Sequence, residues 1–169
     1  METIEAIKTR KSVRSFSTKE IEEEKIETLM KAAMSAPSAI NRQPWHFYVV
    51  KDENKKKELI KTVQFGKYKS PIIIIPCIKV VATIPFNHDL AVCDLSAATE
   101  NILLAAHDMG LGAVWCAIFP NKANIKAVAK VLDAPLGISP FCAIYVGYPS
   151  EDDSSKVKDK YNEKAVKVI

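Results

Sequence analysis

The chain has 169 residues, of which 48% are hydrophobic and 26% are charged, and its formal net charge is +4. This composition excludes a disordered or fibrous chain, and the length fits one domain, residues 1–169, with a core of its own. The mild positive charge fits either a solvated surface or a site for an anionic ligand, and the lack of stacking aromatics among the basic residues argues against nucleic acid.

Hydrophobic periodicity predicts a helix at the start of the chain, over residues 2–9, with Ile4 and Ile7 facing inward. Residues 17–20 form a capping-box pattern, so we expect a second helix from there to about residue 35. The elements expected next, in chain order, are a strand over 46–51, a helix over 53–64, a strand over 72–81, a helix over 90–109, a strand over 113–119, a helix over 121–132 and a strand over 141–148. Four strands separated by helices indicate a layered α/β or α+β domain.

Several features of these elements carry more specific expectations. Pro76 cannot donate to a strand ladder, so it indicates a bulge or an irregular edge. The helix over 90–109 is apolar on nearly every side, which places it at the domain centre or in a subunit interface. The acidic run 151–153 is expected to face solvent, and the apolar run 165–169 has the composition of an added edge strand.

The four cysteines lie far apart, at positions 77, 93, 116 and 142, without metal-binding or redox spacing. We therefore expect them to be buried small hydrophobic residues in a reducing compartment. The polar first nine residues do not resemble a signal peptide, and the apolar run 72–78 is too short to cross a bilayer. The expectation is a cytoplasmic protein with no membrane partner.

No dinucleotide fingerprint, P-loop, zinc-protease motif or serine-hydrolase motif is present in the sequence. His107 lies within an apolar helix, and we interpret it as a satisfied core or interface histidine. The residues suggest no catalytic side chain and no metal site, so the chemistry is expected to belong to a bound organic cofactor.

Two polar loops are candidates for binding that cofactor. Residues 10–14, Arg-Lys-Ser-Val-Arg, place three cations and a hydroxyl within five residues, which suits a phosphate but also describes a solvated turn. The loop 36–45 combines small residues with amides and ends at Trp45. Such a loop suits the approach of a flat ring, and a purely structural loop after a helix would have a similar composition.

Taken together, the motifs resemble the FMN-dependent nitroreductase family over essentially the whole chain, and the length is similar to its short branch. The resemblance rests on R-x-S-x-R at 10–14, A-P-S-A-x-N-x-Q-P-W-H-F at 36–47, G-L-G-A-V-W at 110–115 and G-Y-P at 147–149. It implies an α+β, three-layer α-β-α fold with a mainly antiparallel central sheet of four strands. It also implies a homodimer with two interfacial FMN sites, in which the tail, residues 149–169, extends onto the partner and adds a strand to its sheet.

The resemblance assigns roles to the first loop. Arg10 and Ser12 hold the FMN phosphate, and Lys11 lies beside the ribityl chain. Arg14 approaches the N1 and O2 edge of the ring, where a positive charge stabilises the reduced flavin. In the tail, Lys158 and Lys160 match basic positions on the phosphate, although arginine is common at the second of them.

The remaining site residues are also assigned by resemblance. The positions that reach the flavin from the opposite subunit are Pro37, Ser38, Ala39 and Asn41, while Gln43 and Trp45 anchor their loop. Backbone amides of Ala117 and Ile118 lie near flavin N5. Residues 65–69 and 86–88 are candidate walls of the substrate pocket.

The implied activity is a ping-pong reaction, in which NADH or NADPH reduces the bound flavin by hydride transfer. A nitroaromatic, quinone or similar small-molecule acceptor then takes the electrons. The alternatives are a protein that stores FMN without efficient turnover and a relative with different flavin chemistry, such as reductive dehalogenation. A basic nucleic-acid binder is a more distant alternative.

Overall fold

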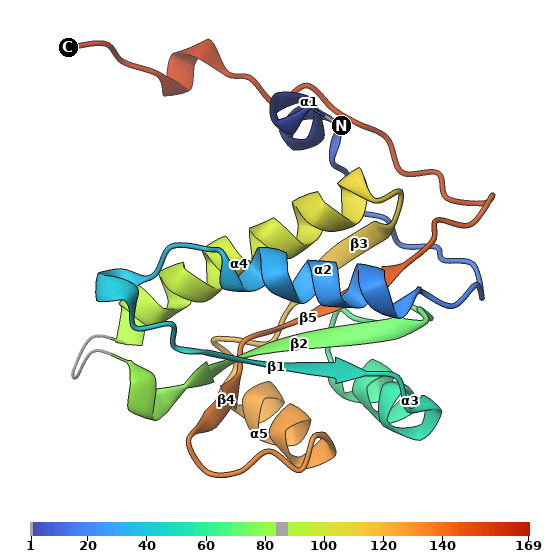
Figure 1. Cartoon of the computed structure of the whole chain (residues 1–169), viewed down its shortest axis with the longest axis vertical. Helices are drawn as coiled ribbons and strands as arrows, with labels where there is room; N and C mark the ends of the chain where they lie inside the picture. Colours follow the sequence, from blue (N-terminus) through green and yellow to red (C-terminus); the bar gives the residue numbers. More distant parts are fainter. Residues whose placement is uncertain (1, 84–87) are drawn as a thin grey trace.

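The computed structural model, which describes residues 2–83 and 88–169, has a five-stranded sheet between two layers of helices (Figure 1). The strand order is β1-β2-β5-β3, with β4 paired to the far end of β2, and every named pair is antiparallel. The strands are β1 (Trp45–Val50), β2 (Ile72–Lys79), β3 (Gly112–Ala117), β4 (Ile138–Pro140) and β5 (Cys142–Gly147). The expected α+β fold is confirmed, and β4 is the one short strand that the sequence did not indicate.

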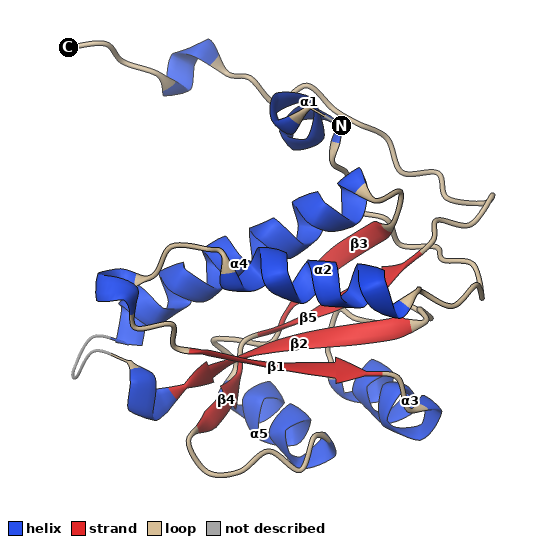
Figure 2. Cartoon of the chain, viewed as in Figure 1, coloured by secondary structure: helices blue, strands red, loops and turns tan. Residues whose placement is uncertain are grey.

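The helices lie on both faces of the sheet (Figure 2). One layer contains α2 and α4, and the opposite layer contains α3 and α5, while α1 lies beside the end of α4. The helices are α1 (Thr3–Thr9), α2 (Glu23–Met34), α3 (Glu53–Thr62), α4 (His88–Asp108) and α5 (Lys122–Val131). Three short 3-10 turns are η1 (Ala39–Asn41), η2 (Val80–Ala82) and η3 (Glu163–Ala165).

The central strands are apolar at nearly every position because both of their faces are covered. In β2, Ile72 and Ile74 pack into the core under α2 and α4, whereas Ile73 and Ile75 pack into the core under α3 and α5. Strand β5 alternates in the same way. The period of two along each strand therefore builds two separate cores, one on each side of the sheet.

Pro76 lies at an irregularity of the sheet, as its position in the sequence predicts. Ile74 of β2 pairs with Ile144, whereas Cys77 pairs with Pro140, so the partner chain contains one extra residue over this interval. The Phe141 amide donates to the Pro76 carbonyl at 2.9 Å. A missing N–H on this side of the strand is tolerated because the ladder is already broken there by a bulge.

The start of α2 differs from the expectation. The helix begins at Glu23 rather than after the pattern at 17–20, and no side chain caps its first turn. The Ser17 hydroxyl instead accepts from the Lys19 amide, and the Ser17 amide donates to the Tyr148 carbonyl at 2.9 Å. Pairing with the end of β5 keeps this segment extended, and that tertiary contact overrides the local capping signal.

Other helix predictions are confirmed. Asn121 caps α5 by accepting from the amides of Ala123 and Asn124 at 3.0 and 3.1 Å. The apolar helix α4 is buried along much of its length between α2 and the sheet. Gly110 follows it in the left-handed conformation that ends helices favourably, with φ of 74°.

Some apolar side chains expected inside are exposed in the single chain. Ile4 and Ile7 of α1 are exposed, and Ala6 is the buried residue of that helix. Cys93 is exposed on α4, whereas the other three cysteines are buried and free. The run 165–169 forms no strand within the chain and is exposed, so the exchange of a tail strand with a partner stays a prediction.

The segment before residue 14 lies against the edge of the sheet because β3 begins with glycine. A Cβ atom at Gly112 would lie 2.6 Å from the Cβ of Val13, closer than two such atoms can approach. The Val13 amide donates to the Ala113 carbonyl at 3.0 Å, and Ser12 forms a parallel bridge with Ala113. Gly112 thus allows the chain from α1 to continue the sheet edge.

We predict that Gly112→Ala destabilises the protein by about 1–3 kcal/mol, because the added methyl group overpacks against Val13. Urea denaturation would measure the change. Adding Val13→Ala to Gly112→Ala should recover part of the loss, since two of the three closest atoms are Val13 methyl groups. A Gly112→Ala protein as stable as the parent would contradict the close approach.

Candidate functional site

Two segments that are far apart in the sequence line one cavity of about 240 Å³, which we call the cationic cavity. One is the stretch 10–14 after α1, and the other belongs to the tail, which runs past α1 in Figure 1. The lining residues are Arg10, Lys11, Ser12, Arg14, Ser155, Lys156, Lys158 and Lys160. The structure therefore brings together all the cations predicted at 10–14 and in the tail, and it adds Ser155 and Lys156, which the sequence analysis did not name.

The edge pairing fixes which way the first segment presents its side chains. Val13 is buried in the core, whereas Ser12 and Arg14, on either side of it, line the cavity. This is the alternation of an extended chain. Arg14 also lies near the thiol of Cys116, which is at the other end of β3. Burial raises the pKa of the Cys116 thiol to about 11, and the positive charge of Arg14 opposes that rise.

The tail is attached to the first segment by polar contacts. The Ser150 amide donates to the Ser15 carbonyl at 3.1 Å, and Lys11 Nζ donates to the Ser155 carbonyl at 2.7 Å. Lys11 Nζ also lies 3.3 Å from the Asp153 carboxylate, which accepts a hydrogen bond from the Ser155 hydroxyl. These contacts hold the lysines of the tail opposite the arginines of the first segment.

Asp153 corrects the expectation that the whole acidic run faces solvent. Glu151 and Asp152 are exposed, but only 6% of the Asp153 side chain is accessible. Burial by itself raises the pKa of Asp153, and hydrogen bonds from Ser155 and Lys11 outweigh it, so the pKa lies below its usual range. The buried carboxylate is therefore charged at neutral pH, and it positions Lys11.

The cationic cavity has an excess of positive charge. Arg10 Nε lies 3.0 Å from Glu100 of α4, and Lys11 pairs with Asp153. Within residues 2–83 and 88–169, the other four cations of the cavity, Arg14, Lys156, Lys158 and Lys160, form no ion pair. Guanidinium forks, ammonium groups and a hydroxyl around one cavity are the donor set that phosphate requires.

The second predicted loop lies elsewhere on the chain. It follows α2 and packs by η1 against the first half of α4, where the Ala39 amide donates to the buried Asp94 carboxylate at 2.9 Å. The Ser38 hydroxyl accepts from the Gln43 amide at 3.0 Å. Pro37 and Asn41 are exposed, and Asn41 has a positive φ of 56°. The loop is thus held in a defined, strained shape with polar groups outward.

Sequence reasoning missed Asp94 as the residue that orders this loop. The available signal was an aspartate inside a helix that is otherwise apolar on nearly every side. A buried carboxylate of this kind needs a donor nearby, and the amide of Ala39 supplies it.

One chain does not bring the two loops together. Loop 36–45 contacts α4 at Asp94, while the residue before Arg10, Thr9, contacts His107 at the end of that helix at 2.8 Å. Thirteen residues of helix separate these contacts, about 20 Å at the rise of an α-helix. Figure 1 shows η1 and α1 at opposite ends of α4. The His107 contact also confirms the interpretation of that histidine as a satisfied residue.

Ala117 and Ile118 lie at the end of β3, four and five residues beyond Ala113. Ala117 is exposed, whereas Ile118 is buried and its amide donates to the Phe141 carbonyl at 3.3 Å. Of the two predicted amide donors, that of Ile118 already has a partner in the single chain. Phe86 and Asn87, named as possible pocket walls, lie outside the described residues.

Comparisons with known proteins identify the family of the chain. A family model described as the nitroreductase family matches residues 7–71 and 64–148. A protein of Archaeoglobus fulgidus named "Putative NADH dehydrogenase/NAD(P)H nitroreductase" is 39% identical over 165 residues, which cover 95% of this chain and 94% of that protein.

Solved structures match over the whole fold. A crystal structure from Parabacteroides distasonis, with the same name as the Archaeoglobus protein, superposes with a TM-score of 0.91 at 36% identity and covers 98% of this chain and 96% of its own. A structure from Desulfovibrio desulfuricans described as "a putative nitroreductase in complex with fmn" gives a TM-score of 0.79 at 28% identity, covering 95% of this chain and 93% of its own. Among the helices of the described residues, none combines the length and apolar character that a membrane span requires.

We predict that Asp153→Asn loosens the tail, because it removes the charge that holds Lys11 and the Ser155 region together. Hydrogen exchange at residues 150–158 should become several-fold faster. Asp152→Asn, which changes an exposed carboxylate of the same run, is the matched control and should have no effect. Equal exchange in the two variants would contradict the role of Asp153.

The same contact has a predictable pH dependence. The pKa of Asp153 is lower in the folded chain than its usual value of about 3.9, so this contribution to tail docking is complete above that value. It should be lost only as the pH falls through the lower folded pKa. Hydrogen exchange of the tail between pH 5 and 2.5 would test this sign.

Proposed function

The chain belongs to the nitroreductase family and is a flavin oxidoreductase of that family, and on this premise we propose that the cationic cavity binds the phosphate of FMN. NADH or NADPH would supply the electrons, and a nitroaromatic, quinone or similar small molecule would accept them. The observation that carries this proposal is the convergence of the segment 10–14 and the tail on one cavity with four unpaired cations among the described residues.

The residues of the cavity divide into binding and positioning roles. Arg10 and Ser12, with Lys158 and Lys160, offer the donors for a phosphate dianion. Lys11 is anchored by Ser155 and Asp153, and its place between the two segments suits the polar chain that follows the phosphate. The cavity, at about 240 Å³, is smaller than the 300–1,000 Å³ typical of a whole-ligand site, so the ring must extend beyond it.

A second copy of the chain would complete the site. The flavin-facing residues proposed for the partner are Pro37, Ser38, Ala39 and Asn41, which lie about 20 Å along α4 from the start of the cationic segment in one chain. Apolar side chains that are exposed near the two halves of the site in a single chain would be covered in such a homodimer. They include Ile4, Ile7 and Ile40, together with Tyr161 and Val166 of the tail. A two-fold dimer would contain two equivalent sites.

When bound, the flavin would supply the hydride and electron chemistry, and the protein's own residues need only bind, orient and tune it. Arg14 has a permanent positive charge with no acidic partner among the described residues, so it would favour negative charge on the ring edge beside it. The exposed Ala117 would offer its backbone near the reacting position, while Ile118, whose amide is already bonded, would shape the wall. Donor and acceptor would occupy the same exposed face in turn.

We expect anaerobic addition of NADH or NADPH to the FMN-loaded protein to bleach the flavin absorption band. Subsequent addition of nitrofurazone or menadione should restore it, because the acceptor reoxidises the cofactor. A protein that binds FMN but stays yellow with both nicotinamides would be a storage protein. A protein that does not bind FMN would contradict the whole proposal.

A heterodimer made from an Arg14→Ala chain and an Asn41→Ala chain should recover one intact site. One of its two sites combines the wild-type Arg14 of one chain with the wild-type Asn41 of the other, whereas the second site contains both substitutions. Flavin absorbance of a heterodimer purified through two different tags should show about half the parental FMN content. Each mutant homodimer serves as the control and should bind FMN poorly. No recovery in the heterodimer would contradict a site shared between subunits.

A further inference from the structure

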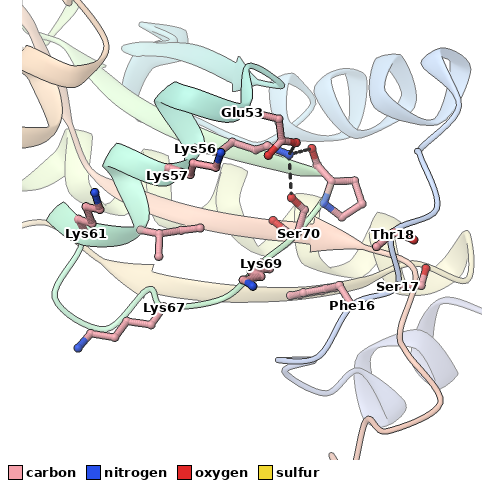
Figure 3. A pocket seen from close by; sticks show the side chains of 12 residues that line it. Phe16, Ser17, Thr18, Glu53, Lys56, Lys57, Lys61, Lys67, Lys69 and Ser70 are labelled. Atoms are coloured by element: carbon pink, nitrogen blue, oxygen red, sulfur yellow. Dashed lines mark hydrogen bonds and ion pairs between the residues drawn. The ribbon is translucent and has the colours of Figure 1, made fainter.

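A second pocket, which we call the α3 pocket, lies between α3 and the chain that follows Arg14 (Figure 3). Its volume is about 610 Å³, well within the range of small-molecule sites. The lining comes from α3, from residues 16–18 and from the segment 67–71 that leads into β2. Of the residues given a role above, Lys67 and Lys69, which belong to the expected substrate wall 65–69, line this pocket.

Buried Lys56 fixes the inner wall of the α3 pocket. Its ammonium group donates to the carbonyls of Ser70 at 3.1 Å and Pro71 at 2.8 Å, and it pairs with Glu53 at 2.7 Å. Only 8% of its side chain is accessible, and its donors are directed to these partners. Lys56 is therefore a structural residue that ties α3 to the entry of β2.

The other lysines of the pocket are exposed and available. Within the described part of the chain, Lys57, Lys61, Lys67 and Lys69 form no ion pair, and Glu53, the one acid that lines the pocket, is already paired with Lys56. Figure 3 shows these lysines on α3 and on the facing segment, around the space that ends at Phe16. The pocket thus has a surplus of positive charge that an anion would compensate.

The interior surface of the pocket is largely apolar. Phe16, Ile60 and Pro71 contribute to it, and Ser17 and Thr18 add hydroxyl-bearing side chains to the lining. An aromatic ring of the chain beside apolar neighbours suits a flat heterocycle, and the surrounding lysines suit phosphate groups. The combination favours a phosphorylated nucleoside over inorganic phosphate alone.

The α3 pocket and the cationic cavity have no lining residue in common, but they lie close together along the chain. Arg14, which lines the cationic cavity, and Phe16, which lines the α3 pocket, are two residues apart, at most about 7 Å of extended chain. A second connection runs through the loop 65–69. The Tyr145 hydroxyl donates to the Gly66 carbonyl at 2.5 Å, and the Cys116 thiol donates to the Phe65 carbonyl at 3.6 Å. Cys116 also interacts electrostatically with Arg14, which lines the cationic cavity.

We propose that the α3 pocket binds the adenosine 2′-phosphate end of NADPH and thereby makes NADPH the preferred donor. The inference rests on the proposed function. It explains how a chain without a dinucleotide fingerprint holds the part of its donor that does not react: the adenine lies against Phe16, and the phosphates meet the lysines of α3 and of the segment 67–69. The loop 65–69, predicted as a substrate wall, then serves both sites.

The test compares the FMN-loaded parent with a double variant, Lys61→Gln with Lys69→Gln. The KM for NADPH should rise about tenfold while kcat changes less than twofold, and the KM for NADH should change much less. Calorimetry with adenosine 2′,5′-bisphosphate as the probe should show a similar loss of affinity. The matched control is Lys122→Gln with Lys126→Gln, which removes two exposed lysines from α5 and changes the net charge equally.

Separate outcomes would overturn the inference or the proposed function. An unchanged KM for NADPH in the double variant, or an equal change in the α5 control, would overturn the inference. Binding of the bisphosphate that is lost in the double variant but does not compete with NADPH would also overturn it, because the pocket would then serve a different phosphorylated compound. Failure to bind FMN would refute the proposed function, and calorimetry on that same protein would still report whether the pocket binds the nucleotide.

Discussion

The site depends on the backbone pairing between residues 12–13 and Ala113 at the edge of β3. This pairing turns the end of an exposed helix into a rigid extension of the sheet, and Gly112 permits it because a side chain there would collide with Val13. With Val13 in the core, Ser12 and Arg14 must point outward. Three cations within five residues repel one another, and a free loop would separate them. The sheet edge holds them in one place, so the repulsion is already overcome when an anion arrives.

The tail depends on the same pairing. Pairing of Phe16 with Pro149 and contacts between Ser15 and Ser150 bring the end of β5 alongside the first segment, and Asp153 then attaches to Lys11. A buried carboxylate among cations is stable only where it is paired and hydrogen-bonded, which explains why Asp153 has several donors. Its charge orders Lys11 and the tail at the same time, and the later lysines of the tail follow from that attachment.

Much of this architecture was predictable from the sequence because the controlling signals are local. The alternation of β2 and β5, the Asn121 cap and the bulge at Pro76 follow from the chemistry of single residues. The start of α2 was wrong because a tertiary contact, the pairing of Ser17 with Tyr148, overrides a correct local pattern. Asp153 and Asp94 were missed for a related reason, since the partners that bury them lie more than fifty residues away in the sequence. The exposure of Cys93 and Ile4 could not be predicted either, because hydrophobic periodicity identifies the apolar face of a helix but does not show whether another part of the chain covers that face.

The ion pairs of the described residues distinguish the cations that already have an acidic partner from those that do not. Arg10, Lys11 and Lys56 each have an acidic partner and help to tie one segment to another, and the contact of Arg10 with Glu100 uses its Nε atom, which leaves its other donors for the phosphate proposed above. Arg14 and seven lysines that have no acidic partner among the described residues line the two pockets on either side of the segment 14–16. Without these eight cations, the rest of the chain has 16 basic against 20 acidic residues, so the net positive charge of +4 comes from the two pockets. Unpaired like charges near one another lower the stability of the folded chain. Their concentration at two adjoining pockets is therefore best understood as a cost retained for binding anions, a flavin phosphate in one and a nucleotide phosphate in the other.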